Sequence, residues 1–462
     1  MLDEKAVKQA MEMAIFEGAD FVEFFAEDKL SGVIRTVGGK VDEILTGRDF
    51  GVGIRVLKGL KSIYAYTNDV SSDSLMRLSR EAVSSLSRGE SREIVFLRNE
   101  IRNLSRIEKS LFKVPRTEKL NLLARGYKTA KEYSDLITQV TANYMEEEQD
   151  ILIANSEGLW AQDKRVRTRL SFSSVATLGE EMQQGFSGPG ASMGFEFHEL
   201  NPPEETAREA SRIAVAMIQG EYSRGGTMPV VIDNGFGGVL FHEACGHALE
   251  ASFVSKGVSA FSNKLGTMVA SPIVTAIDDG TIPNAWGTTN IDDEGTLTAK
   301  NILIEDGVLK SYLVDRLNGK RMGIASTGSA RRQSYRFAPT SRMNNTYIAQ
   351  GSSNPEDIIS STEYGLYAKT MGGGSVNPAT GDFNFAVMEG YLIEDGKITK
   401  PLRGATLVGN GAKVLELIDA VGNNLTLGQG NCGAESGMVP ANVGQPMIRV
   451  KQLTVGGRSE DN

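Results

Sequence analysis

Hydrophobic residues along the first 200 positions follow two patterns in turn, one typical of helices and the other of strands. Spacings of three and four predict amphipathic helices over 3–17, 72–87, 117–133 and 202–219. Period-two alternation predicts strands over 20–27 and 31–36, a hairpin over 51–69 turning at Lys58–Gly59, and an antiparallel meander over 144–190. This part of the chain therefore predicts a mixed domain built on an antiparallel sheet.

The helix over 202–219 marks the end of this first domain. Asn201 is placed to cap its first turn, the prolines that follow suit helical entry, and Gly220 ends it. The polar stretch after it contains paired glycines and is typical of a link. We therefore expect an N-terminal α+β domain over residues 1–222 and a C-terminal domain over 223–462.

The pattern changes after this link. A strand over 229–233 leads through an Asn-Gly turn into a short helix. From residue 268 onward, strand and turn patterns dominate, with Asp-Gly hairpins at 306–307 and 395–396 and a glycine-rich loop over 371–378. The predicted fold class is α+β. In it, an N-terminal α/β-mixed domain precedes a large, mostly antiparallel β domain that carries the short helix.

Composition narrows the classes of protein. The chain has 462 residues and a formal net charge of −9, which disfavours direct binding to nucleic acid. Its N-terminus lacks the continuous apolar core of a signal peptide, and no window has the character of a membrane span. Two cysteines cannot build a disulfide framework. Together these features favour a protein of the cytoplasm.

The short helix carries the strongest chemical signal, GVLFHEACGHALE over residues 238–250. It holds two of the three histidines of the chain, His242 and His247, with Glu243 directly after the first. Imidazole is a preferred zinc ligand, but a five-residue step on an ideal helix turns the second side chain roughly 140° away. The two histidines can share a metal only if a π-turn inserts one residue or the helix breaks at Gly246.

A third ligand must come from elsewhere, and the two cysteines are the candidates. Cys245 lies inside the motif, but its side chain points differently from the histidines. Cys432 lies in the glycine-flanked sequence GQGNCGAESG, where a thiolate can approach a metal, with a buried structural thiol as the alternative. Glu243, turned to the open side of the metal, can act as general base, with a solvated carboxylate as the alternative. His198 is interpreted as structural.

Two other segments carry weaker signals. Asp292, Asp293 and Glu294 precede Gly295 and could bind a cation, although charged turns are mostly solvated. The segment 330–347 gathers four arginines and two tyrosines. Such a segment suits a loop that lines a substrate site and stabilises an oxyanion, or equally a loop packed by salt bridges.

Four separated stretches resemble the TldD branch of the TldD/PmbA (TldE) family, in the same order: FHEACGHALE, IDDEGT, RRQSYRFAPTSRMNNTY and GNCGAESGMVPANVGQPMIRVKQLTVGG. The resemblance implies a two-domain zinc metallopeptidase in which His242, His247 and Cys432 bind Zn²⁺ and Glu243 is the catalytic base. It also implies a heterodimer with a PmbA/TldE-like subunit, enclosing a cavity for extended, unfolded peptides such as leader peptides or a labile antitoxin. A homodimer is the alternative assembly for the isolated chain.

Two rival functions stay open at this point. The first is a non-catalytic binding or regulatory subunit with a structural zinc, which requires a fourth protein ligand such as Cys245 or Asp293. The second is a zinc amidase of deformylase-like chemistry, because a Cys-His-His site with a glutamate serves that reaction too. The number of protein ligands distinguishes a structural zinc site from that of a peptidase. An amidase and a peptidase can be distinguished only by the substrate that each cleaves.

Overall fold

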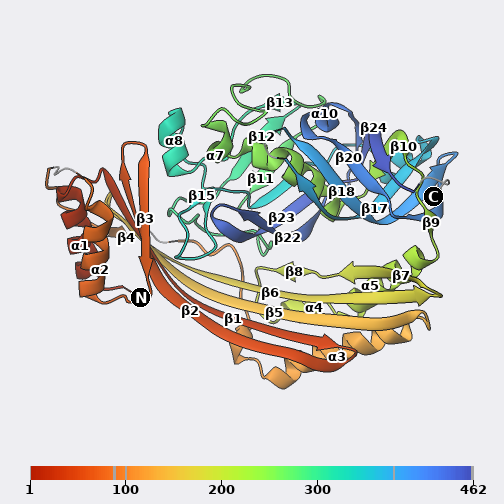
Figure 1. The fold of residues 1–462 in the computed structure, drawn as a ribbon, viewed down its shortest axis with the longest axis horizontal. Helices are drawn as coiled ribbons and strands as arrows, with labels where there is room; N and C mark the ends of the chain where they lie inside the picture. Colours follow the sequence, from red (N-terminus) through yellow and green to blue (C-terminus); the bar gives the residue numbers. More distant parts are fainter. Residues whose placement is uncertain (1, 87–89, 99–100, 378–379, 459–462) are drawn as a thin grey trace.

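The computed structural model describes residues 2–86, 90–98, 101–377 and 380–458, which form two halves that lie one above the other with the long axis horizontal (Figure 1). An extended, curved sheet with its helices forms the N-terminal half, and two further large sheets form the C-terminal half. The α+β fold class expected from the sequence is confirmed, with antiparallel pairing dominant throughout.

Long antiparallel strands dominate the N-terminal sheet, in the order β3-β2-β1-β5-β6-β4, with β7 and β8 also paired to β6. The strands are β1 (Phe21–Val37), β2 (Lys40–Lys58), β3 (Lys61–Thr67), β4 (Leu97–Arg98), β5 (Ile137–Asn155), β6 (Leu159–Leu178), β7 (Glu181–Ser187) and β8 (Gly190–Ala191). The predicted break between 27 and 31 is wrong, because β1 pairs without interruption with both β2 and β5 there. Gly32 sits inside this strand because the Glu146 side chain of β5 crosses it.

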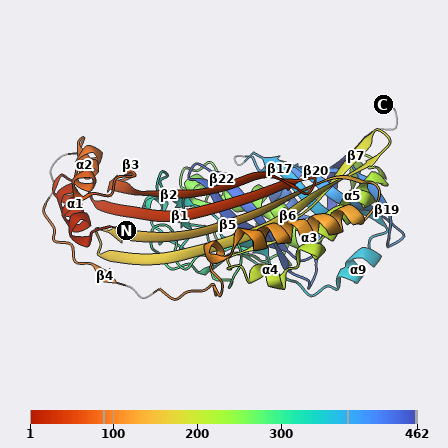
Figure 2. The ribbon, with the colours of Figure 1, turned by 90° about the horizontal axis from the view of Figure 1, so that it is seen from below.

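Helices cover one face of this sheet at its two ends (Figure 2). The helices α1 (Glu4–Phe16) and α2 (Ser72–Val83) pack at one end, and α3 (Arg116–Glu132) and α5 (Pro203–Ile218) pack at the other. Helix α2 ends before its predicted limit, and part of the predicted range lies outside the described residues. The predicted cap at Asn201 is wrong: Pro202 occupies the N-cap position of α5, and the Asn201 side chain donates to Phe197 O of α4 (Phe197–Leu200).

The first C-terminal sheet closes on itself, because β17, β10, β24, β20 and β18 pair in a ring. Its strands are β9 (Glu221–Tyr222), β10 (Gly226–Ile232), β17 (Tyr364–Val376), β18 (Asp382–Glu394), β19 (Lys397–Arg403), β20 (Thr406–Asn410), β21 (Ile418–Val421) and β24 (Ile448–Gly456). The expected loop over 371–378 is wrong up to residue 376, which belongs to a bulged part of β17, and residue 378 lies outside the described ranges.

The second C-terminal sheet has the order β13-β12-β11-β16-β23-β22. Its strands are β11 (Ala276–Asp279), β12 (Lys300–Glu305), β13 (Val308–Leu309), β16 (Asn345–Ile348), β22 (Thr426–Ala434) and β23 (Gly437–Gln445), and β14 (Ala330–Arg331) pairs separately with β15 (Thr340–Ser341). Short helices interrupt the strands expected from 268 onward: α8 (Arg316–Met322), α9 (Pro355–Ser360) and α10 (Gly411–Glu416). Both predicted Asp-Gly turns are present, with positive φ at Asp306 and Asp395.

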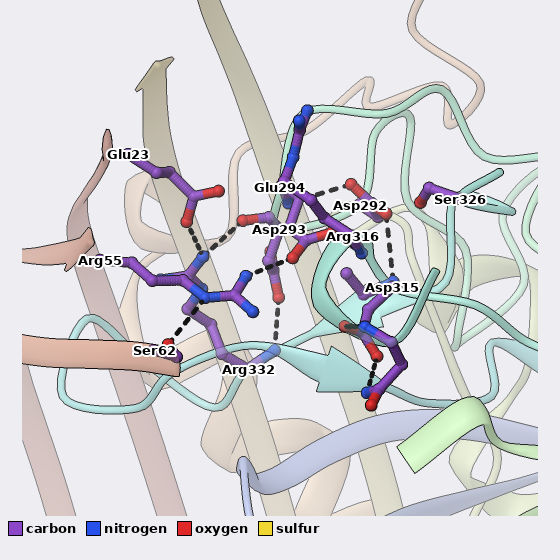
Figure 3. Close-up of polar contacts among 12 residues, drawn as sticks. Glu23, Arg55, Ser62, Asp292, Asp293, Glu294, Asp315, Arg316, Ser326 and Arg332 are labelled. Carbon is purple, nitrogen blue, oxygen red and sulfur yellow. Dashed lines mark hydrogen bonds and ion pairs between the residues drawn. The ribbon is translucent and has the colours of Figure 1, made fainter. Parts of the chain in front are cut away.

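The halves meet through buried ion pairs between the long strands and the segment around 292–294 (Figure 3). Arg55 of β2 pairs with Glu294, and Arg165 of β6 donates to Asp293 at 2.7 Å. Backbone N–H groups of residues 294, 296 and 330 donate to Asp292. Because these acids are buried and already occupied by donors, they join the halves, and the alternative of a cation site here loses its support.

The chain crosses between the halves close to the predicted boundary. Strand β9, which ends at residue 222, pairs with β19 of the C-terminal half. The division into 1–222 and 223–462 stays a prediction. In the described ranges, no helix combines the length and the apolar character needed to cross a bilayer.

Candidate metal centre

The histidine motif follows β10 on a short and irregular helical segment. The segment contains a 3-10 turn (Gly235–Gly238), α6 (Val239–Phe241), a π-turn (His242–Gly246), a second 3-10 turn (His247–Leu249) and α7 (Ala251–Val254). The N–H of His247 donates to the carbonyl of His242, the five-residue hydrogen bond of a π-helix. Their ring centroids lie 5.2 Å apart. Of the two distortions expected from the spacing, the protein therefore has the π-turn.

Gly246 is needed for packing and not for backbone freedom. Its φ of −56° and ψ of −50° are ordinary helical values, so the helix does not break at this glycine. A Cβ here would lie 2.3 Å from Sδ of Met343, a fully buried side chain. The absence of a side chain thus lets the π-turn sit against the segment that leads into β16.

Cys432 reaches the two histidines from β22, near the other end of the chain. Its Sγ lies 3.2 Å from Nε2 of His242 and 3.2 Å from Nε2 of His247. Within the described ranges, these three side chains are the set of His, Cys and acidic donors close enough to share one ion. Burial opposes ionisation of the thiol, but the two histidines outweigh it and hold the pKa of Cys432 well below its ordinary value.

The three donors fit a zinc ion in type and in spacing. Bonds of about 2.3 Å to sulfur and about 2.0 Å to nitrogen place tetrahedral ligand atoms roughly 3.5 Å apart. The separations of 3.2 Å between the thiol and each imidazole are close to that value. Zinc sites that keep a fourth position open have three protein ligands, and histidine and cysteine are both among the residues that serve there.

Two buried charges, Glu250 and Arg342, hold these ligands in place, a role that the sequence analysis assigned to neither. Glu250 Oε1 lies 3.1 Å from Nδ1 of His247, so the ring keeps Nε2 toward the site. Arg342 donates to the backbone carbonyl of Cys432 and lies 4.0 Å from Glu250. Glu250 stands three residues after His247, and Arg342 is one of the four arginines of the segment 330–347. Neither signal indicated that these side chains hold the metal ligands.

Glu243 lies on the wall of a pocket beside the donors. Its Oε2 lies 3.7 Å from Nε2 of His247, and its side chain is 32% exposed, in contrast to the buried ligands. The pocket has a volume of about 390 Å³ and is also lined by Thr340, Val376 and Glu435. A half-exposed carboxylate beside buried donors can exchange a proton with a group in the pocket.

The other histidine and cysteine lie away from this centre. His198 is buried in the N-terminal half, where Nε2 contacts Thr168 Oγ1 at 2.8 Å, and burial lowers the pKa of His198 to about 4. Cys245 is fully buried in the apolar core of the C-terminal half, and burial raises the pKa of its thiol. Neither joins the three donors, and Asp293 is held by Arg165.

The arginine-rich segment 330–347 is mostly packed by salt bridges and carbonyl contacts. Arg332 pairs with Glu23 at 2.6 Å across the two halves, and Arg336 pairs with Asp49 at the surface. Among the described residues, Thr340 is the one member of this segment that lines the pocket beside Glu243. The packing alternative therefore describes these arginines better than a substrate-lining role.

Three consecutive ranges of the chain match domain models of one known protein family. The matches are PmbA/TldA metallopeptidase domain 1 over residues 22–86, the central domain over 109–218 and the C-terminal domain over 225–457. The donor residues and the pocket glutamate all lie in the third match.

Individual relatives extend over most of the chain. "Metalloprotease TldD homolog" of Buchnera aphidicola subsp. Acyrthosiphon pisum is 38% identical over 420 residues, covering 88% of this chain and 87% of its own length. The homologue of the same name from Haemophilus influenzae is 38% identical over 423 residues, with 88% and 87% covered. The structure of a putative modulator of a DNA gyrase from Thermotoga maritima has the same fold, with a TM-score of 0.82, 21% identity and coverage of 98% and 100%. The chain belongs to the PmbA/TldD metallopeptidase family, in which these two sequence relatives are named as metalloprotease TldD homologues.

Proposed function

We propose that this protein is a zinc-dependent peptidase that cleaves extended, unfolded peptides in the cytoplasm. One observation carries the proposal: His242, His247 and Cys432 converge beside a pocket whose wall includes the partly exposed Glu243. The three donors would hold the zinc ion. When bound, zinc would supply Lewis acidity for attack by water on a peptide carbonyl.

The side chains around the proposed zinc ion have different roles in the reaction. Glu243 acts as the general base, taking a proton from the attacking water and passing it to the amine that leaves. Glu250 fixes the orientation of His247 through the Nδ1 hydrogen bond, and Arg342 fixes the backbone of Cys432. Their burial keeps both positions rigid while Glu243 stays accessible to substrate.

An extended peptide suits the strand that carries Cys432. Strand β22 is the outermost strand of its sheet, and Gly433 and Ala434 near its end line the pocket. A peptide that pairs with an edge strand is bound through its backbone, so that a wide range of side chains is accepted. In a folded protein most backbone N–H and C=O groups are already paired within the protein itself. We therefore propose that unfolded peptides, such as leader peptides or a labile antitoxin, are the substrates.

We also propose that the chain acts with a PmbA/TldE-like subunit. The part of β2 that includes Val41 and Leu45 is exposed, and these two apolar side chains are 50% and 55% exposed. Apolar side chains on an uncovered part of a sheet are typical of surfaces that another subunit covers. A homodimer of the isolated chain is the alternative use of this surface.

The structural-zinc rival lacks support at the site. It needs a fourth protein ligand, but among the described residues the donor group has three members. Its named candidates, Cys245 and Asp293, are occupied elsewhere. The zinc amidase rival has the same donor set, so cleavage tests must include a formylated amide as well as peptides.

The test compares wild type with Glu243→Gln, each with and without the PmbA/TldE-like subunit. Zinc content and cleavage of an unfolded casein-type substrate are measured on the same samples. We expect both proteins to hold one zinc and the variant to lose cleavage by roughly 10²–10⁴-fold. Glu435→Gln, on the same pocket wall, is the matched control and is expected to keep cleavage. Equal cleavage by wild type and Glu243→Gln would refute the assignment of the base.

A further inference from the structure

A second cavity, separate from the pocket at the metal centre, lies between the two halves of the chain. It has a volume of about 210 Å³, several times the roughly 30 Å³ that a water molecule occupies in the liquid. Its N-terminal wall is the sheet face that carries Lys29, Arg165 and Arg167. Its C-terminal wall includes Arg331 and Arg332. We refer to it as the arginine cavity.

The sheet places its cations in register. Lys29 of β1 pairs with Gln149 of β5, which pairs with Arg165 of β6, so their side chains share one face. Two residues further along β6, Arg167 lies on the same face opposite Glu147. The alternation of the strands thus directs three cations and one acid toward the C-terminal half.

The cations around the arginine cavity differ in whether a carboxylate pairs with them directly. Arg165 has Asp293 at 2.7 Å, and Arg332 has Glu23 at 2.6 Å. A further acid, Asp163, approaches Arg165 at 3.6 Å. Lys29 and Arg167 share Glu147, at the longer distances of 3.9 Å and 3.7 Å. These acids form direct ion pairs with four of the five cations that line the cavity. The fifth cation, Arg331, has no such pair in the described part of the chain.

Arg331 has no carboxylate within ion-pair distance in the described part of the chain. Its side chain is 4% exposed, and its Nη1 donates a hydrogen bond to the carbonyl of Met343 at 2.7 Å. Burial first, and then Arg167, lower the pKa of Arg331 to about 9, although Asp293 opposes this shift. A buried guanidinium without a carboxylate in direct contact is unfavourable unless a further group pairs with it.

We propose that the arginine cavity binds a small oxyanion, a phosphate or a carboxylate, between Arg331 and Arg167. Guanidinium groups recognise both ligands through paired, charge-assisted hydrogen bonds. Arg167 donates Nε and Nη2 to the carbonyls of Trp286 and Thr288, which fixes its plane. A bound anion would join the two halves of the chain. Asn431 of β22 lines the cavity, and it directly precedes Cys432. Because successive side chains of a strand point to opposite faces, a bound anion would lie on the face of β22 opposite to Cys432.

The test measures anion binding by the full chain purified without phosphate or carboxylate buffers. Thermal unfolding midpoints are recorded against inorganic phosphate, and separately against acetate, with chloride keeping the ionic strength constant. Equilibrium dialysis with labelled phosphate gives the stoichiometry. For wild type we expect a rise in midpoint that saturates with one of the anions, because a ligand that binds only the folded state stabilises it. The anion that saturates distinguishes a phosphate ligand from a carboxylate ligand.

Variants decide whether the cavity is the site. Arg331→Gln removes a buried charge that has no carboxylate partner, so it is expected to fold and to weaken anion binding by at least about tenfold. Arg167→Met, a second variant on the opposite wall, is expected to weaken it as well. Arg336→Gln, in the same segment but paired with Asp49 at the surface, is the control and should bind as wild type does. Saturation that is unchanged in Arg331→Gln, or absent from wild type with both anions, would overturn the proposal.

Discussion

Glu250 offers the sharpest test of how the protein positions its proposed metal ligands. Its carboxylate is 1% exposed and lies 3.1 Å from Nδ1 of His247. Substitution Glu250→Ala leaves this nitrogen without its acceptor, so the ring can rotate or change tautomer. Glu250→Gln keeps an acceptor oxygen but removes the charge. The ligand atoms themselves are untouched in both variants, so any loss of zinc reports on orientation.

The size of the effect follows from the burial of this contact. Removing an outer partner of a metal-bound histidine typically weakens metal affinity by about 10–100-fold, which corresponds to about 1.4–2.7 kcal/mol. Because Glu250 also lies 4.0 Å from Arg342, its loss leaves a second buried charge less compensated. We therefore expect Glu250→Ala near the upper end of that range and Glu250→Gln near the lower end.

Competition with a fluorescent zinc chelator measures these affinities directly. Wild type, Glu250→Ala, Glu250→Gln and the pocket variant Glu435→Gln are compared at one pH, and circular dichroism checks that each is folded. The expected order of zinc affinity is wild type equal to Glu435→Gln, then Glu250→Gln, then Glu250→Ala. If folded Glu250→Ala binds zinc as tightly as wild type, the hydrogen bond to His247 does not position the ligand.

Three further predictions concern stability. Gly246→Ala places a methyl group against Met343, and overpacking of this kind costs about 1–3 kcal/mol; chemical denaturation should show it, and a second substitution, Met343→Ala, should recover part of the loss. Glu294→Gln leaves Arg55 buried without its partner, which should cost about 3–5 kcal/mol and is contradicted by an unchanged denaturation midpoint. His198 stays neutral in the folded protein because burial lowers its pKa from 6.5 to about 4, so the unfolded state binds more protons between these values. Stability should therefore fall as pH falls through this window, by up to about 3 kcal/mol, and His198→Gln should remove that share of the pH dependence.

Local pattern was a reliable guide where one element buries one face. The amphipathic helices α1, α3 and α5 lie within a residue or two of their predicted ranges, because each packs a single apolar stripe against the sheet. The same logic was wrong for β1, which was predicted as two strands. Its middle is a polar stretch around Gly32, and only pairing on both sides with β2 and β5 makes it continuous.

Segments rich in glycine and charge were harder to interpret from the sequence. Residues 371–376 have the composition of a loop, yet they pair with β18 through several bulges. The acids at 292–294 have the composition of a solvated turn, yet they are buried by Arg55 and Arg165 from the other half. In both cases the partner is far away in sequence, and composition alone carries no information about it.

The sequence by itself determined which side chains have the chemistry for a metal centre. The spacing of His242 and His247 required a distortion of the helix, and the π-turn is the distortion found. Only the tertiary structure brought Cys432 to the histidines and left Cys245 in the core, because that choice depends on packing between segments more than 180 residues apart. Tertiary packing likewise decided the roles of Glu250 and Arg342, since a buried charge takes its function from the partner that compensates it.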